Sequence, residues 1–144
     1  MKRSASLNHS LKKAAVIGHP ISHSKSPLIH NHWLQHYGLP VQYDAMDVSP
    51  DHLATVMDTI RGNEWVGINV TIPNKEAVLA YLDETDPMVH IIGACNTIVN
   101  DGGRLMGYNT DAPGFDYPIQ DHAIQSALVL GNGGAAKAVL YQLC

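Results

Sequence analysis

The sequence predicts an α/β fold with a mostly parallel sheet and helices on both faces. Three observations lead to this prediction. Short apolar runs that end near glycine or proline alternate along the chain with segments of helical periodicity. Serine, asparagine or aspartate stands at the start of several helical segments, where these residues can cap a helix. The last apolar run is followed by a glycine-rich segment that opens a final helix. Strands that alternate with helices in this way are typical of a parallel sheet.

The first half of the chain contains three predicted strands and two predicted helices. An apolar run ends at Gly18 and Pro20, as expected for a buried strand. Pro27 stands where a helix takes its first residue, with Ser26 as the expected N-cap. The expected elements are a strand over 14–18, a helix over 27–37, a strand over 41–48, a helix over 50–60 and a strand over 65–71.

The second half contains a hairpin and a further strand–helix unit. Two apolar runs flank Asp101-Gly102-Gly103, which is a hairpin signal. The expected elements are a helix over 74–82 capped by Asn74, a short helix over 87–92, strands over 94–100 and 104–108, a helix from 111 that Pro118 stops early, a strand over 127–131 and a helix from about 135.

The composition predicts a globular cytoplasmic protein. Apolar residues make up 45% of the 144 residues and charged residues 15%, which argues against disorder. With a net charge of −4, no basic stripe and no long apolar run, neither nucleic acid nor a membrane is an expected partner. The polar residues 1–13 are expected to form a disordered tail. Cys95 and Cys144 have no metal or redox spacing. Among the nine histidines, His32 and His36 have no carboxylate between them, and His19 and His23 have no cysteine or acidic residue at ligand spacing, so no metal site is expected.

Two serines follow the first predicted strand. Ser24 and Ser26 lie beyond its carboxyl end, where ligands bind in an α/β sheet. Hydroxyl groups and free N–H groups at a helix N-terminus suit a carboxylate. On local grounds alone, the structural interpretation is favoured, with Ser26 as an N-cap and Ser24 as a turn residue.

Thr71 and Lys75 lie at the same predicted edge of the sheet, where the third strand ends and a helix begins. A lysine against the positive end of a helix dipole gains nothing structurally. Its ammonium would be easier to deprotonate there, as a general acid or base requires. The alternative is an ordinary surface lysine.

Asn96 and Asp111 are the third pair of candidates. Asn96 lies in Gly93-Ala-Cys-Asn-Thr97, and its carboxamide can both donate to and accept from a ligand hydroxyl. Asp111 can pair with a lysine, although its position ahead of Pro113 also fits a helix N-cap.

A glycine-rich loop follows the strand predicted over 127–131, as in the first strand–helix unit of a Rossmann-type domain. Glycines there allow a tight turn and a close approach to a pyrophosphate at the helix N-terminus. The last helix reaches Cys144 without a stop signal, so the sequence is expected to end inside this domain. The candidate cofactor-binding residues are Gly131, Asn132, Gly133, Gly134 and Ala135.

Together these segments resemble the shikimate dehydrogenase family. Five motifs occur in the family's order and approximate spacing, and this agreement outweighs the local structural interpretations. They are Ser-x-Ser-Pro at 24–27, Asn-Val-Thr-x-Pro-x-Lys at 69–75, Gly-Ala-x-Asn-Thr at 93–97, Asn-Thr-Asp at 109–111 and Gly-x-Gly-Gly-Ala-Ala at 131–136.

The resemblance implies the reversible reduction of 3-dehydroshikimate to shikimate by a nicotinamide dinucleotide. NADP is expected, with NAD left open because the residues that read the ribose would follow Cys144. Ser24 and Ser26 would hold the substrate carboxylate, and Lys75 would exchange a proton as the catalytic partner of Asp111. The residues implied to contact the substrate are Ser24, Ser26, Thr71, Lys75, Asn96 and Asp111.

The resemblance also divides the chain. Residues 14–111 would form a substrate-binding domain, and residues 112–144 a linker and the truncated start of a dinucleotide-binding domain, so the chain alone is expected to be inactive. A quinate or quinate/shikimate dehydrogenase and a non-catalytic shikimate-binding module stay open as alternatives, as does a homodimer. The Tyr-x-x-x-Lys pair of methylenetetrahydrofolate dehydrogenases is missing, because Thr71 stands four residues before Lys75.

Overall fold

Six strands form one mixed sheet in the structure, a computed structural model that describes residues 11–144. The strand order is β2-β1-β3-β5-β6-β4. The pairs β1–β2, β1–β3 and β4–β6 are parallel, whereas β5 is antiparallel to both β3 and β6. The strands are β1 (Lys12–Gly18), β2 (Val41–Asp47), β3 (Trp65–Val70), β4 (Glu84–Thr85), β5 (Thr97–Asp101) and β6 (Arg104–Tyr108).

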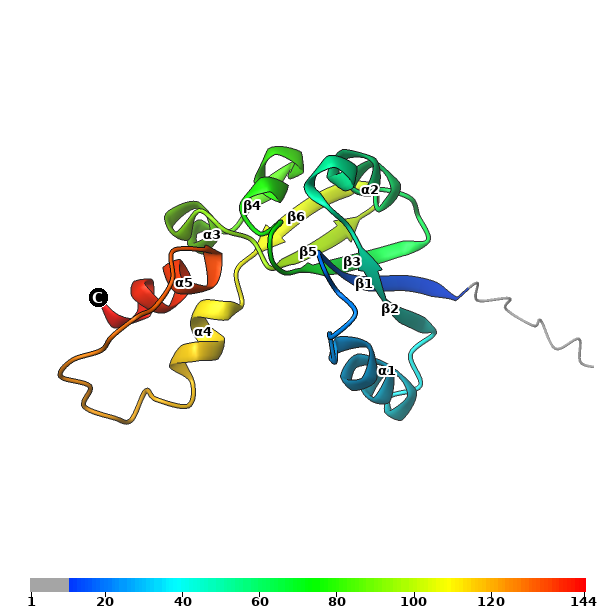
Figure 1. Ribbon diagram of the computed structural model, residues 1–144. Coiled ribbons are helices and arrows are strands. Elements are labelled where there is room, and N and C mark those ends of the chain that lie inside the picture. The colour runs from blue at the N-terminus through cyan, green and yellow to red at the C-terminus, as the bar shows by residue number, and fades with distance from the viewer. Residues whose placement is uncertain (1–10) are drawn as a thin grey trace, which may run out of the picture.

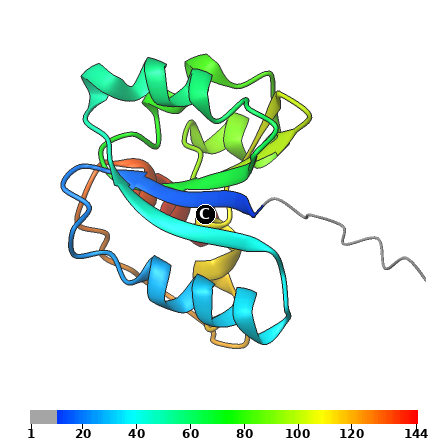
Figure 2. The same cartoon turned by 90° about the vertical axis from the view of Figure 1, so that its right-hand side faces the viewer.

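Helices cover both faces of this sheet, which confirms the predicted fold class (Figure 1). In Figure 1, α2 and the neighbouring 3₁₀ helices lie above the sheet and α1 lies below it; Figure 2 shows the same layers from the side of β1 and β2. The helical elements are α1 (Ser26–His36), η1 (Pro50–His52), α2 (Leu53–Thr59), η2 (Ala77–Tyr81), α3 (Pro87–Ile92), α4 (Asp111–Asp116) and α5 (Gly134–Leu143).

Two hydrophobic clusters hold the helical layers to the sheet. The larger one includes Ile17 of β1, Leu53 of α2 and Val78 of η2. The smaller one lies on the α1 side and includes Val16 of β1 and Tyr43 of β2. Because Val16 and Ile17 are neighbours in a strand, they point to opposite faces, and β1 is buried from both sides. Within residues 11–144, no helix combines the length and the apolar character needed to cross a bilayer.

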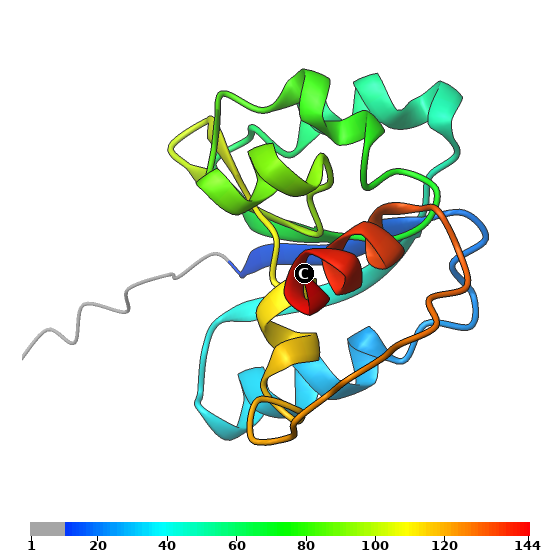
Figure 3. The ribbon, with the colours of Figure 1, turned by 90° about the vertical axis from the view of Figure 1, so that its left-hand side faces the viewer.

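A third cluster, in which three of the four buried residues are alanines, joins α3, α4 and α5 at the end of the sheet where the site lies. It contains Ile92, Ala94, Ala112 and Ala138. Figure 3 shows α5 lying alongside α4. Alanine side chains let these helices approach closely, so α5 is attached to the rest of the fold.

Residues 127–131, predicted as a strand, do not form one in the structure. Leu128 and Leu130 are 84% and 87% exposed. Among the described residues, no strand pairs with this segment. A strand needs a neighbour for its backbone hydrogen bonds, so the apolar run by itself does not produce one.

The predicted tail is shorter than expected where the structure describes it. Lys12 and Lys13 belong to β1, because their N–H groups donate to Pro40 O at 2.9 Å and Glu64 O at 2.8 Å. The Lys13 ammonium also lies 5.7 Å from the centre of the Trp65 ring. The prediction for residues 1–10 lies outside the described residues.

The helix predicted over 74–82 is a shorter 3₁₀ helix, η2. Asn74 does not cap it. Its buried carboxamide instead donates to Val48 O at 2.7 Å and fixes the turn before η2 to the end of β2. The sequence also misses β4, which has only two residues, and the short 3₁₀ helix η1 ahead of α2.

Candidate functional site

The candidate site lies at the edge of the sheet where β1 and β3 end. Thr71, just after β3, donates its N–H to Ile17 O at 2.9 Å, so these parallel strands end together. β5 runs the opposite way, and its first residue, Thr97, lies opposite Asn69 of β3 and Tyr108 at the end of β6. Residues just before β5 and just after β6 therefore reach the same edge as the residues that follow β3.

Lys75, Asn96 and Asp111 form one hydrogen-bonded group at this edge. Lys75 Nζ forms an ion pair with Asp111 Oδ2, and Asn96 Nδ2 donates to Asp111 Oδ1 at 2.8 Å. The Lys75 and Asp111 side chains are 16% and 29% exposed, so the pair is partly buried but accessible to a ligand. A cation, a carboxylate and a carboxamide in contact can bind hydroxyl groups and exchange a proton with one of them.

Asp111 is available for this pair because another residue caps α4. Asn109 Oδ1 accepts hydrogen bonds from the N–H groups of Asp111 at 3.1 Å and Ala112 at 3.2 Å. Asn109 is itself buried and donates to Ala94 O at 2.9 Å. The alternative prediction of Asp111 as the N-cap is therefore wrong, since Asp111 is the first residue of α4. As predicted, α4 ends before Pro118.

The prediction that Lys75 lies against the positive end of a helix dipole is also wrong. Lys75 lies in a turn, and the next helical element is the five-residue 3₁₀ helix η2. Its electrostatic partner is the carboxylate of Asp111 rather than a helix dipole. The neighbouring Glu76 pairs with Lys137 of α5 at 2.8 Å, which connects this turn to the glycine-rich loop and helix.

A cavity of about 530 Å³ lies between the turn that carries Lys75 and the glycine-rich loop. The structure thus brings the candidate catalytic lysine and the candidate cofactor loop together. Thr71 lines the same cavity, whereas Ser24, Ser26, Asn96 and Asp111 do not. The predicted site residues in its lining are Thr71, Lys75, Gly131, Gly133, Gly134 and Ala135.

Two glycines of this loop occupy positions that disfavour any side chain. Gly131 has a φ of 138°, in the region that favours glycine. A Cβ on Gly134 would lie 2.8 Å from Ala94 Cβ and 3.3 Å from Lys75 Cβ. Gly133 precedes α5 and has an extended conformation. Asn132 and Ala135 are exposed at the same helix N-terminus.

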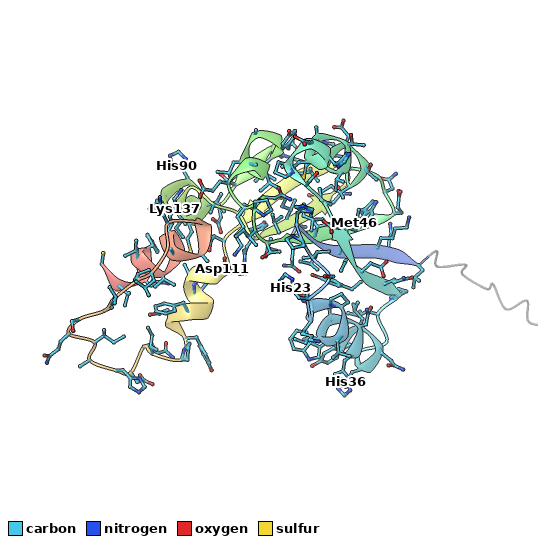
Figure 4. All side chains as sticks on the ribbon, in the orientation of Figure 1. His23, His36, Met46, His90, Asp111 and Lys137 are labelled. Carbon is cyan, nitrogen blue, oxygen red and sulfur yellow. The ribbon has the colours of Figure 1, made fainter. Side chains whose placement is uncertain are left out.

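Ser24 and Ser26 interact with each other at the start of α1. The helix begins at Ser26 itself, and Ser24 Oγ accepts a hydrogen bond from the Ser26 N–H at 3.3 Å. Ser26 is therefore not the N-cap. Within residues 11–144, no hydrogen bond joins either serine to the Lys75 group. Figure 4 shows His23 of this loop and Asp111 of α4 next to the same edge of the sheet.

Four further polar residues surround Asn96 and were not predicted as part of the site. Thr110 donates its N–H to Asn96 Oδ1 at 2.8 Å, and Thr97 Oγ1 donates to the same oxygen at 3.2 Å. Asn69 bridges Thr97 and Tyr43. Burial raises the pKa of Tyr43 to about 12, so its hydroxyl stays protonated. Asn69, Thr97 and Thr110 lie within recognised motifs, but Tyr43 carries no comparable sequence signal.

Comparison with known proteins agrees with the motifs. The family model described as the shikimate dehydrogenase substrate-binding domain matches residues 16–98, more than half of the chain. The NADP⁺ shikimate dehydrogenase of Symbiobacterium thermophilum is 47% identical over 132 residues, which cover 89% of this chain and 45% of that protein. The chain spans about half the length of the curated relatives it matches.

Solved structures with the same fold include two different reductases. Shikimate 5-dehydrogenase from Thermus thermophilus, in complex with NADP(H) and shikimate, is 43% identical with a TM-score of 0.83, over 92% of this chain and 51% of that one. The ligand-free 5-ketofructose reductase of Gluconobacter sp. strain CHM43 is 30% identical with a TM-score of 0.80, over 92% of this chain and 49% of that one.

Proposed function

The chain belongs to the shikimate dehydrogenase family, and we propose that it forms the substrate-binding part of an NADP-dependent enzyme that interconverts 3-dehydroshikimate and shikimate. One observation carries the proposal: Lys75, Asn96 and Asp111, which are far apart in the sequence, form a single hydrogen-bonded group. The names of the curated relatives and the ligands of the Thermus thermophilus structure support the substrate and the cofactor.

Lys75 is the proposed proton donor. During reduction the carbonyl oxygen of the substrate gains a proton while its carbon gains a hydride. Asp111 forms an ion pair with the ammonium of Lys75, and Asn96 donates a hydrogen bond to Asp111. The ammonium that would donate the proton is therefore held in a fixed position. During oxidation Lys75 accepts the proton from the substrate hydroxyl.

The remaining polar residues of the edge are proposed to hold the substrate. Ser24 and Ser26 offer hydroxyl groups at the N-terminus of an eleven-residue helix, where partial positive charge favours a carboxylate. Thr71 and Asn96 lie on either side of Lys75 in the chain and can bind ring hydroxyls. The polar groups would thus surround a small hydroxylated acid.

The residues of the glycine-rich loop fit a dinucleotide pyrophosphate. Gly131 has a positive φ, Gly133 exposes its backbone, and α5 is ten residues long, so its N-terminal N–H groups can bind an anion. The proposed contact residues are Gly131, Asn132, Gly133, Gly134 and Ala135. When bound, NADP supplies the hydride.

The proposal divides the described chain into a substrate-binding domain over 14–111 and the start of a dinucleotide-binding domain over 112–144. It places the activity in the cytoplasm, where the thiols of Cys95 and Cys144 stay reduced. Size-exclusion chromatography of the protein decides between a monomer and a homodimer.

The proposed substrate is tested by calorimetric titration of shikimate into the protein, with quinate and 5-ketofructose titrated in parallel. Shikimate is expected to bind and the other two to bind more weakly. Lys75→Met is titrated as well, because it keeps the aliphatic stem that packs against Gly134 and removes only the charge. Its affinity for shikimate is expected to change far less than its kcat. Lys12→Met, at the opposite end of β1, is the control. A wild type that does not bind shikimate, or that prefers quinate, would refute the substrate assignment.

The proposed catalytic role is tested in a chimera that joins this chain to the remaining half of the Thermus thermophilus enzyme. Lys75→Met should lower kcat by roughly 10²–10⁴-fold, the usual contribution of a general acid or base, and should change shikimate affinity far less. Lys12→Met should leave kcat unchanged. A normal kcat with only a raised KM in Lys75→Met would make Lys75 a binding residue.

A further inference from the structure

A continuous series of side-chain hydrogen bonds connects β2 to the candidate site. Tyr43 Oη donates to Asn69 Oδ1 at 2.6 Å, and Asn69 Nδ2 donates to Thr97 Oγ1 at 3.2 Å. Thr97 Oγ1 donates to Asn96 Oδ1 at 3.2 Å, and Asn96 Nδ2 donates to Asp111 Oδ1 at 2.8 Å. We call Tyr43, Asn69, Thr97 and Asn96 the Tyr43 network. It ends on the carboxylate that pairs with the candidate catalytic lysine.

The network crosses three strands because their registers place the side chains on one face. Asn69 of β3 is paired directly with Thr97 of β5, so the two side chains lie side by side. Between β2 and β3, β1 carries Ala14 next to Tyr43. The tyrosine ring extends across this strand on the α1 side, where Val16 and Ile21 pack against it. The hydroxyl therefore reaches β3.

All four hydrogen bonds of the network point toward Asp111, each group donating to the next. A carboxamide has an acceptor end and a donor end, and its neighbours decide which way it is turned. While Tyr43 donates to Oδ1 of Asn69, the Nδ2 group of Asn69 must face Thr97. The Thr97 hydroxyl then accepts from Asn69 and can donate its own proton to Asn96 Oδ1 at 3.2 Å, with Thr110 Oγ1 as a second neighbour at 3.4 Å. The Tyr43 hydroxyl thus favours the orientation of Asn96 that presents Nδ2 to Asp111.

Tyr43 is itself held firmly. It is 5% exposed, and the His30 ring stacks on it with centroids 4.2 Å apart and planes inclined by 15°. Asn31 binds its backbone twice, donating to Tyr43 O at 2.7 Å and accepting from Tyr43 N at 3.0 Å. Both partners belong to α1, the helix that begins at Ser26. Tyr43 therefore connects α1 to the network that ends on Asp111.

We propose that Tyr43 is a positioning residue of the site, acting through Asn69 and Thr97 on the carboxamide of Asn96 and so on Asp111. Its catalytic consequence rests on the proposed function, whereas its effect on Asn96 does not. Asn96 Oδ1 also accepts the Thr110 N–H at 2.8 Å, so loss of Tyr43 loosens Asn96 without releasing it. The effect is that of about one hydrogen bond, or a roughly three- to tenfold change.

The structural part is tested without any ligand. Tyr43→Phe keeps the ring, its stacking on His30 and the backbone bonds to Asn31, and removes only the hydroxyl. Nuclear magnetic resonance of side-chain amides should show shifted Asn69 and Asn96 signals and exchange of the Asn96 amide protons with water about threefold or more faster. Tyr37→Phe, on a side chain that is 71% exposed, is the matched control and should change neither signal.

The catalytic part is tested in the same chimera as Lys75. Tyr43→Phe should lower kcat about three- to tenfold with a smaller change in KM. If Tyr43 acts through Asn69, then Asn69→Ala and the Tyr43→Phe, Asn69→Ala double variant should have the same kcat. Equal kcat in these two variants supports action through Asn69; additive losses would mean that Tyr43 reaches the site by another route.

The results separate this inference from the proposed function. A wild type that does not bind shikimate overturns the function, while the amide signals still decide whether Tyr43 orients Asn96. An unchanged Asn96 amide in Tyr43→Phe overturns the inference even if shikimate binds. A shifted Asn96 amide with unchanged kcat also overturns it, because the orientation of Asn96 would then not affect the reaction.

Discussion

Gly134→Ala should destabilise the protein because the new side chain would clash where α5 packs closely against the rest of the fold. The new Cβ would lie 2.8 Å from Ala94 Cβ and 3.3 Å from Lys75 Cβ. Carbon atoms in contact normally lie about 3.5–4.0 Å apart, so α5 would have to move by roughly 0.7–1.2 Å. Gly134 has no positive φ, so the effect is steric rather than conformational. Overpacking of this kind costs about 1–3 kcal/mol.

Urea unfolding followed by circular dichroism measures this loss, and the neighbouring glycine provides the control. A Cβ on Gly133 would meet no atom within 4 Å, and its φ of −83° suits alanine. Gly133→Ala should therefore change the free energy of unfolding by less than about 0.5 kcal/mol. Equal destabilisation by the two substitutions, or none by Gly134→Ala, would refute the packing of α5 against Ala94 and Lys75.

Three further predictions concern other parts of the chain. Ser24→Ala and Ser26→Ala should each weaken shikimate binding by about 1–3 kcal/mol in calorimetry, and unchanged affinity in both would remove the carboxylate assignment. The hydrogen bonds from Arg61 lower the pKa of Asp83, so this carboxylate stabilises the fold above its unfolded-state pKa of about 3.9. The stability difference between wild type and Asp83→Asn should therefore shrink as the pH falls from about 5 to 2. Burial raises the pKa of Cys95, so iodoacetamide should modify it only after denaturation, as mass spectrometry can show.

Periodicity and turn residues predict most of this fold, but not the segments whose structure depends on distant partners. The runs that became β1 and β3 are largely apolar, the run that became β2 alternates, and all three find neighbours on at least one side. The run over 127–131 is just as apolar and has no paired neighbour among the described residues, so it stays irregular. The sequence cannot distinguish these cases, because pairing is a property of the whole sheet.

In the site too, the residues in local motifs can be predicted from the sequence, whereas a residue that matters through a distant partner cannot. Lys75, Asn96 and Asp111 were found through motifs, and the sheet then brought them into contact because β5 runs antiparallel to β3. Tyr43 was missed because a tyrosine on a strand is ordinary, and only its hydrogen bond to Asn69 distinguishes it.

The three glycines of the glycine-rich loop stand at their positions for two different physical reasons. A phosphate cradle explains Gly131, which has a positive φ, and Gly133, which leaves the helix N-terminus open. It does not explain Gly134, whose missing side chain lets α5 approach Ala94 and the stem of Lys75. Gly134 therefore packs the start of α5 closely against both Ala94 and the stem of Lys75. The third glycine of the motif is therefore explained by packing against Ala94 and Lys75, the proposed proton donor, as well as by its place in the proposed cofactor loop.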